Sequence, residues 1–239
     1  MGRAAGRPQV ICGESPKGAS AAKTSRSKLG KMTETVDPSL AQAIDSLSLP
    51  HILIGHRLIS PGDESALLEE EARSIASPLV GVRRASGAAR IVGRQLLARL
   101  GYADCALPKS PSGAPIWPAG FCGSFAHDDR VAVAAVAMRR DVAAVGIDVE
   151  PAELLPPELL EMVATPQERR RLGDDPYRGR LLFAAKEAVY KAVYPLDRIF
   201  LDYHDIEVDL AGRRAVVRNG RVVDLRICMS AHLVVLALI

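Results

Sequence analysis

The stretches GIDVE, at residues 146–150, and FAAKEAVYKA, at residues 183–192, decide how this chain folds and what it can bind. The first ends an apolar, β-branched run that predicts a strand, and the second has the composition of a helix. Side chains alternate between the two faces of a strand, so we expect Asp148 and Glu150 to point the same way. The helix is expected to end before Pro195, because proline cannot continue a helix without losing a hydrogen bond.

The predicted helix places Glu187 and Lys191 on one face, because residues at i and i+4 are neighbours. Three acids, Asp148, Glu150 and Glu187, suit a hard cation such as Mg²⁺, which takes oxygen ligands and binds substrate phosphates. Each pattern alone also has an ordinary explanation. An acidic strand end is usually solvated, and a Glu–Lys pair on a helix is usually a surface ion pair worth roughly 0.3–0.5 kcal/mol.

Together, in this order, the two stretches resemble the signature of the 4′-phosphopantetheinyl transferases. That signature is a G-I-D-V-E-like strand followed by a helix with F-x-x-K-E-x-x-x-K. Every signature position is filled: Gly146, Asp148, Glu150, Phe183, Lys186, Glu187 and Lys191. Upstream, residues 113–137 are similar to the family's W-P-x-G and G-S-x-x-H segment, with Ser124 and His127 in the expected places. The W-P-x-G form resembles the branch that includes the enterobactin-synthetase type of bacterial enzyme.

The resemblance has departures. Ala126 stands where that branch commonly has Ser or Thr, so one hydroxyl contact to the ligand is expected to be lost. Arg84 and Arg90 lie in a predicted helix similar to the family's arginine-containing helix, but Ser86 and Ala89 break its pattern.

The resemblance implies an activity and a set of functional residues. The enzyme would transfer the 4′-phosphopantetheine arm of coenzyme A to a serine of an apo acyl, peptidyl or aryl carrier protein, releasing adenosine 3′,5′-bisphosphate. Siderophore or nonribosomal peptide synthesis is the favoured pathway. Mg²⁺ would be held by Asp148, Glu150 and Glu187, and Glu187 and Lys191 would be catalytic. Coenzyme A would be bound by Arg84, Arg90, Ser124, His127, Asp148, Lys186 and Lys191.

Two other classes of function stay open. One is a catalytically inactive protein that binds coenzyme A as a scaffold or sensor, and the intact acidic set argues against it. The other is a Mg²⁺-dependent phosphohydrolase. The lack of a second acidic cluster in the sequence, which a two-metal site would need, argues against that alternative.

The amino-acid composition excludes several classes of protein and predicts the cellular compartment. The net charge is only +3 over 239 residues, which argues against a nucleic-acid-binding protein. The four cysteines have no C-x-x-C spacing and predict reduced thiols in a cytoplasmic protein. No apolar run has the length of a membrane span. We expect a monomer without nucleic-acid partners, and we assign His51, His56, His204 and His232 to structure.

The order of elements predicts an α+β fold, because a helix followed by strands occurs twice. Residues 1–31 contain few bulky apolar side chains and are expected to be a disordered extension. The N-terminal half is expected over residues 32–140 and the C-terminal half over residues 141–239. The family resemblance further implies two similar halves related by a pseudo-twofold axis, with the active site in the cleft between them.

Overall fold

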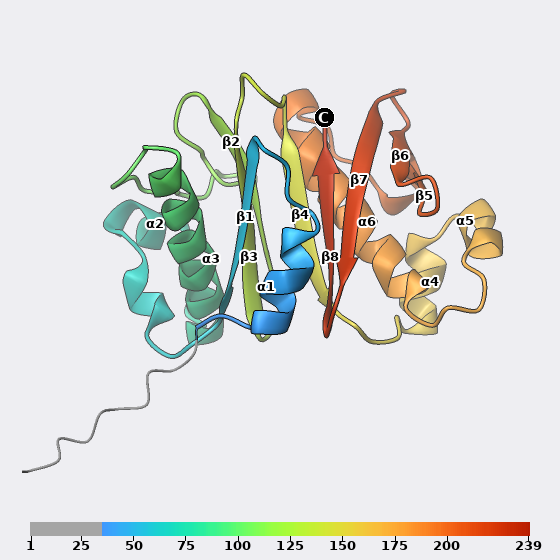
Figure 1. The fold of residues 1–239 in the computed structure, drawn as a ribbon, viewed down its shortest axis with the longest axis horizontal. Coiled ribbons are helices and arrows are strands. Elements are labelled where there is room, and N and C mark those ends of the chain that lie inside the picture. The colour runs from blue at the N-terminus through green and yellow to red at the C-terminus, as the bar shows by residue number, and fades with distance from the viewer. Residues whose placement is uncertain (1–34) are drawn as a thin grey trace, which may run out of the picture. The chain divides into compact units, whose positions relative to one another are not determined.

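The computed structural model describes residues 35–239, so the extension expected over residues 1–31 lies outside the described residues. The described chain mixes helices with antiparallel sheets, which confirms the α+β prediction (Figure 1). It forms one compact unit. Its elements are described below in two parts, each of which contains one sheet.

The first part is built around a small sheet. Its helical segments are α1 (Pro38–Asp45), the 3-10 helix η1 (Asp63–Ala66), α2 (Glu69–Ser74) and α3 (Val80–Arg99). Its strands are β1 (Ile52–Leu58), β2 (Phe121–His127) and β3 (Val131–Met138). The strands pair antiparallel in the order β1-β3-β2, with Ser124 opposite Ala135. The α3 helix packs on this sheet.

The second part has a larger sheet with the order β4-β8-β7-β6-β5. Its helical segments are α4 (Pro157–Val163), α5 (Pro166–Arg171), α6 (Arg178–Asp197) and the 3-10 helix η2 (Tyr203–Asp205). Its strands are β4 (Val145–Pro151), β5 (Ile206–Asp209), β6 (Arg214–Val217), β7 (Val222–Met229) and β8 (His232–Leu238). Asp148 in β4 is opposite Val235 in β8, so the acidic strand lies at an edge of this sheet.

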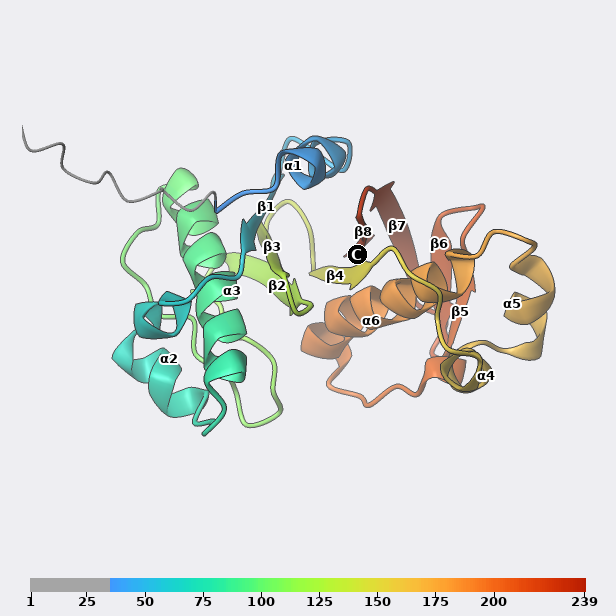
Figure 2. The same ribbon diagram turned by 90° about the horizontal axis from the view of Figure 1, so that it is seen from below.

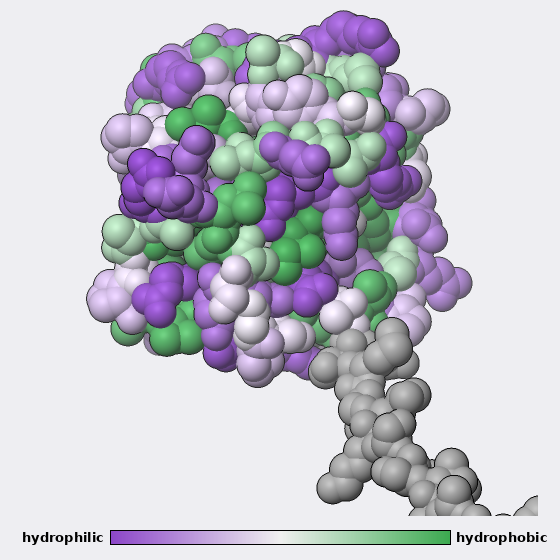
Figure 3. Space-filling model, turned by 90° about the vertical axis from the view of Figure 1, so that its left-hand side faces the viewer, coloured by the Kyte–Doolittle hydropathy of each residue, from purple (hydrophilic) through white to green (hydrophobic). Residues whose placement is uncertain are grey.

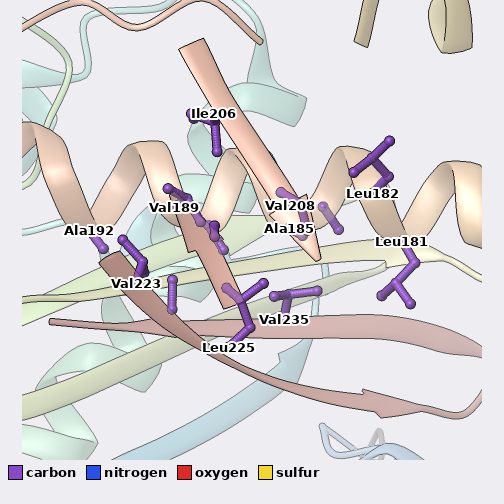
Figure 4. Close-up of a cluster of buried hydrophobic side chains, with 14 of the residues drawn as sticks. Leu181, Leu182, Ala185, Val189, Ala192, Ile206, Val208, Val223, Leu225 and Val235 are labelled. Atoms are coloured by element: carbon purple, nitrogen blue, oxygen red, sulfur yellow. The ribbon is translucent and has the colours of Figure 1, made fainter. Parts of the chain in front are cut away.

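Three apolar layers hold these parts together. Val92, Leu96 and Leu97 of α3 pack against the smaller sheet, and α6 packs against the larger sheet through residues such as Leu182 and Val189 (Figure 4). A third cluster combines residues of both sheets with the apolar side of α1. Figure 2 shows α1 on one side of the two sheets, and α3 and α6 pack on the opposite faces.

Local sequence signals explain where several helices begin. Asp37 caps α1 by accepting hydrogen bonds from the backbone of Ser39 and Leu40. Thr165 and Glu168 form a capping box at the start of α5.

The predicted end of the signature helix is wrong. Helix α6 continues through Pro195 to Asp197, and it ends at Arg198, whose backbone is left-handed with φ 53°. Pro195 cannot donate a backbone hydrogen bond within the helix, yet the helical conformation continues for two further residues, so the proline does not set this boundary.

The outer face over α2 and α3 mixes hydrophilic and hydrophobic residues (Figure 3). The start of α3 exposes the large apolar side chains Leu79, Val80 and Val82. The first turn of α3 is therefore not covered by the described part of the chain.

Candidate active site

A glycine brings the acidic strand and the signature helix into contact. A Cβ atom added to Gly146 would lie 1.9 Å from the carbonyl oxygen of Ala188 and 2.7 Å from the backbone nitrogen of Ala192. Such distances are impossible for a side chain, so only glycine allows β4 and α6 to approach this closely. The approach places the side chain of Asp148 beside that of Lys191.

Asp148 and Lys191 form the centre of the site. Lys191 Nζ donates to Asp148 Oδ1 at 2.6 Å and lies 3.4 Å from the carbonyl oxygen of Ile147. The other oxygen, Asp148 Oδ2, is buried and has no hydrogen-bond partner within residues 35–239. Burial raises the pKa of Asp148 from 3.8 to about 6, although the ammonium of Lys191 opposes this effect. A buried acceptor without a partner is the kind of group that a cation would satisfy.

Each of the other two predicted acids has its own neighbour. Arg180 donates to Glu150 Oε2 at 3.0 Å, and Tyr203 Oη donates to Glu187 Oε1 at 2.8 Å. Partial burial raises the pKa of Glu150, and burial together with Glu187 raises that of Tyr203. The charges of Glu150 and Glu187 both raise the pKa of Asp148, so the acids interact through space.

The three acids fit Mg²⁺ in chemical type but do not form a finished ligand set. Their donors are all carboxylate oxygens, which hard cations prefer, and Asp148 Oδ2 is free to bind. Among the described residues, however, no three His, Cys, Asp or Glu side chains are grouped as metal ligands. Mg²⁺ commonly uses one or two carboxylates together with water and substrate phosphates, so a complete protein cage is not required.

A cleft of about 680 Å³ lies beside these residues. Its walls come from α3, the loop that contains residues 109–117, the strand β2 and the C-terminal part of α6. Of the predicted site residues, five line it: Arg90, Ser124, His127, Glu187 and Lys191. Asp148 is buried next to Lys191 and contributes no lining surface. The cleft therefore brings together residues from both parts of the fold.

The wall from the first part is cationic and partly aromatic. Arg90 is buried, donates to the carbonyl oxygens of Leu107 and Ser86, and lies over the ring of Phe125. Burial lowers the pKa of Arg90 to about 10, so it remains charged at neutral pH. His127, at the end of β2, has its pKa lowered by desolvation and by the nearby charge of Lys191.

Trp117 fixes the shape of this wall. A Cβ atom on Gly123 would lie 2.5 Å from the Trp117 ring, so the indole packs directly on the glycine backbone. Its ring also packs on Phe125, with centroids 4.9 Å apart. Trp117 therefore both anchors its loop and lines the cleft. Ala126 is buried in the cluster between the sheets and is not part of the cleft wall, so no lost ligand contact follows from it.

Two predicted contacts to coenzyme A need correction. The ammonium of Lys186 is buried and donates to Glu168 Oε2 and to the carbonyl oxygens of Val163 and Tyr203. All three of its donors are therefore used inside the core, away from the cleft. Arg84 pairs with Glu64 through two hydrogen bonds and does not line the cleft. The residue types at Ser86 and Ala89 already departed from the family pattern around Arg84.

The sequence missed several residues of the site. Lys109, Arg139 and Arg198 line the cleft, and Arg180 holds Glu150. Arg180 lies two turns before Glu187 on the same helix, and that spacing was a usable signal. Tyr203 had none, because it follows the helix in a loop and reaches Glu187 only through the tertiary fold.

Comparison with known proteins agrees with this geometry. Family models match the 4′-phosphopantetheinyl transferase N-terminal domain over residues 70–137 and the 4′-phosphopantetheinyl transferase superfamily over residues 144–234. The 4′-phosphopantetheinyl transferase Npt of Nocardia iowensis is 36% identical over 180 residues, covering 74% of this chain and 76% of Npt. The chain belongs to the 4′-phosphopantetheinyl transferase family.

Other relatives of this transferase are similar in the same region. Svp of Streptomyces mobaraensis is 39% identical over 156 residues, which are 62% of this chain and 63% of Svp. PptT of Mycobacterium tuberculosis is 36% identical over 145 residues, which are 59% of this chain and 64% of PptT. The family modifies carrier proteins with coenzyme A as the donor. Over the described residues, no helix is long and apolar enough to span a membrane.

Proposed function

We propose that this transferase moves the 4′-phosphopantetheine arm of coenzyme A to a serine of an apo carrier protein, with Mg²⁺ and with release of adenosine 3′,5′-bisphosphate. The observation that carries the proposal is the buried Asp148–Lys191 pair beside Glu187, at the wall of a cationic cleft. Phosphoryl transfer depends chiefly on positioning of the substrate and on stabilisation of charge. The two carboxylates, the ammonium of Lys191 and the cleft together supply both.

The cleft suits the size and charge of coenzyme A. Ligand pockets typically have volumes of about 300–1,000 Å³, and this cleft has about 680 Å³. The cations that line it are Arg90, Lys109, Arg139, Lys191 and Arg198. A pyrophosphate and a 3′-phosphate need several such charges, and His127 adds a further hydrogen-bonding group. The aromatic wall around Trp117 offers a surface for the adenine ring.

Asp148, Glu150 and Glu187 would hold Mg²⁺ next to the pyrophosphate. When bound, the metal would withdraw charge from the phosphorus and orient it for attack. The unpaired oxygen Asp148 Oδ2 supports this role, because it lacks a hydrogen-bond donor among residues 35–239. Arg180 and Tyr203 would keep Glu150 and Glu187 in place.

The remaining work falls to Glu187 and Lys191. The carrier serine hydroxyl attacks the phosphorus attached to pantetheine, and Glu187 takes its proton as general base. The bond from this phosphorus to the bridging oxygen breaks, and adenosine 3′,5′-bisphosphate leaves with that oxygen. Lys191 would neutralise the charge that develops there. Both side chains line the cleft, which supports these roles.

The W-P-x-G segment favours a carrier of siderophore or nonribosomal peptide synthesis.

The test is to incubate the protein with coenzyme A, Mg²⁺ and separate apo carriers of acyl, peptidyl and aryl type, and then to measure the mass of each carrier by mass spectrometry. Transfer adds the phosphopantetheine mass, and we expect it first on the peptidyl or aryl carrier. A phosphohydrolase would consume coenzyme A and leave every carrier unchanged. An inactive scaffold would leave both coenzyme A and every carrier unchanged.

A further inference from the structure

Tyr203 lies outside the signature helix residues and contacts Glu187, the proposed general base. It lies in η2, beyond the end of α6, and its hydroxyl donates to Glu187 Oε1 at 2.8 Å. The second oxygen, Glu187 Oε2, makes no side-chain hydrogen bond within residues 35–239, while Glu187 itself lines the cleft. The phenol thus occupies one oxygen of the carboxylate and leaves the other without a side-chain partner among the described residues.

The position of Tyr203 is itself fixed by α6. Its backbone carbonyl accepts a hydrogen bond from Lys186 Nζ at 2.9 Å, and its ring packs on Phe183 with centroids 5.9 Å apart. Its backbone N–H donates to Asp202 Oδ1 at 2.6 Å, within the cap of η2. Consecutive helix residues, Lys186 and Glu187, therefore hold the two ends of one tyrosine.

The network behind Tyr203 is rigid. Lys186 also donates to Glu168 Oε2 at 2.7 Å and to the carbonyl of Val163 at 2.8 Å, and both partners belong to the core of the second part. Glu168 in turn accepts from the backbone of Val208 at 2.7 Å. A chain of buried hydrogen bonds thus runs from the larger sheet through Lys186 to Tyr203 and ends at Glu187.

We propose that Tyr203 is a positioning residue of the transfer reaction, which holds the Glu187 carboxylate in its productive orientation. This inference rests on the proposed function, because it takes Glu187 as the general base and metal ligand. A glutamate side chain has three rotatable bonds, so a fixed hydroxyl at one oxygen selects one orientation among many. Groups that orient metal ligands in this way typically change metal affinity or activity about 10–100-fold when they are lost.

The test is Tyr203→Phe, which removes only the hydroxyl, with Tyr102→Phe as the matched control. Tyr102 is exposed, lies in the first part of the fold and does not line the cleft. We expect Tyr203→Phe to lower kcat about 10-fold, with an unchanged KM for coenzyme A and an unchanged melting temperature. The control variant should match the wild type in every measurement.

A binding measurement separates positioning from general damage. Mn²⁺ replaces Mg²⁺ as the probe, and free Mn²⁺ is measured by its electron paramagnetic resonance signal in the presence of coenzyme A without carrier. Tyr203→Phe should weaken Mn²⁺ binding about 10-fold, and in the Glu187→Ala background it should change nothing further. A Tyr203→Phe enzyme with normal kcat and normal Mn²⁺ affinity would overturn the inference. So would a loss of kcat that merely follows a lower melting temperature.

The variant Glu187→Ala separates a failure of the positioning role of Tyr203 from a failure of the proposed role of Glu187. If Glu187→Ala abolishes transfer while Tyr203→Phe behaves as the control, only the positioning role fails. If Glu187→Ala keeps full transfer, the proposed role of Glu187 fails, and the inference fails with it.

Discussion

Helix α6 carries two lysines whose surroundings differ sharply. Lys186 faces the core, where its ammonium donates to one carboxylate and two carbonyl oxygens and is fully buried. Lys191, just over one turn later, faces the cleft, pairs with Asp148 and keeps about a quarter of its side chain exposed (28%). Residue type and signature position are therefore poor guides to role, and the number of free donors is a better one. A lysine with all donors used serves the fold, and one with a free face can serve chemistry.

The largest effect is expected at the cleft lysine. Lys191→Ala should lower kcat about 100-fold to 1,000-fold, the usual cost of removing one group that stabilises developing charge, while KM for coenzyme A changes much less. Such a split marks an interaction made mainly in the transition state. Lys191→Arg should recover little, because a planar guanidinium cannot replace a compact ammonium. Steady-state kinetics at saturating Mg²⁺ measures both variants, and near-normal rates would mean that Lys191 is only the ion-pair partner of Asp148.

The core lysine should instead affect stability. Lys186→Met leaves the buried Glu168 carboxylate without its cation and should lower the free energy of unfolding by about 3–5 kcal/mol. The double variant Lys186→Met/Glu168→Gln should be clearly more stable than Lys186→Met alone, because the uncompensated charge is gone. Urea unfolding followed by circular dichroism measures this. If Lys186→Met were as stable as the wild type but unable to bind coenzyme A, the predicted contact between Lys186 and coenzyme A would be right.

The next comparison is between His127, which lines the cleft, and Arg84, which does not. His127→Ala should weaken coenzyme A binding by about 1.5–3 kcal/mol, the usual value of a charge-assisted hydrogen bond. Arg84→Ala should leave binding unchanged, because Arg84 is paired with Glu64 outside the cleft wall. Calorimetry with coenzyme A and its 3′-dephospho form measures the effect. Selective loss of the 3′-phosphate preference in Arg84→Ala would contradict the placement seen here.

The smallest effect concerns the burial of Asp148. Its folded pKa of about 6 lies above its usual value of 3.8, so the folded protein keeps this proton to higher pH than the unfolded chain does. The free energy of unfolding should therefore fall as pH rises from about 4 to about 6 and stay lower above that range. Asp148→Asn removes this dependence and should stabilise the metal-free protein at pH 7.5 by roughly 1–3 kcal/mol. Urea unfolding in EDTA checks this, and a steeper pH dependence in the variant would refute it.

The sequence predicted the parts of the site that depend on local spacing. The helical spacing of α6 predicted that Glu187 and Lys191 share one face, and both line the cleft. The approach of Asp148 to Lys191 depends instead on the packing of β4 against α6 at Gly146. Arg90, Ser124 and His127 were also found, and they line the cleft. The α+β class followed from the order of the elements.

Other features depend on tertiary packing and could not be derived from spacing. Lys186 lies next to Glu187 in the sequence, yet a rotation of about 100° per helical residue turns it into the core. Tyr203 reaches the site only because Lys186 and Phe183 hold the segment after α6. The pairing of Arg84 with Glu64 joins α3 to η1 across a sequence separation of 20 residues. The role of each of these side chains depends on the neighbours that the tertiary fold brings to it.

The most direct test of the account follows both products of one reaction. Apo carrier, coenzyme A and Mg²⁺ are mixed with the enzyme, and adenosine 3′,5′-bisphosphate is quantified alongside the mass gain of the carrier. The account predicts equal amounts of the two, no product when the carrier serine is replaced by alanine, and no product with Asp148→Asn. Release of the nucleotide without modified carrier, or undiminished transfer by Asp148→Asn, would contradict it.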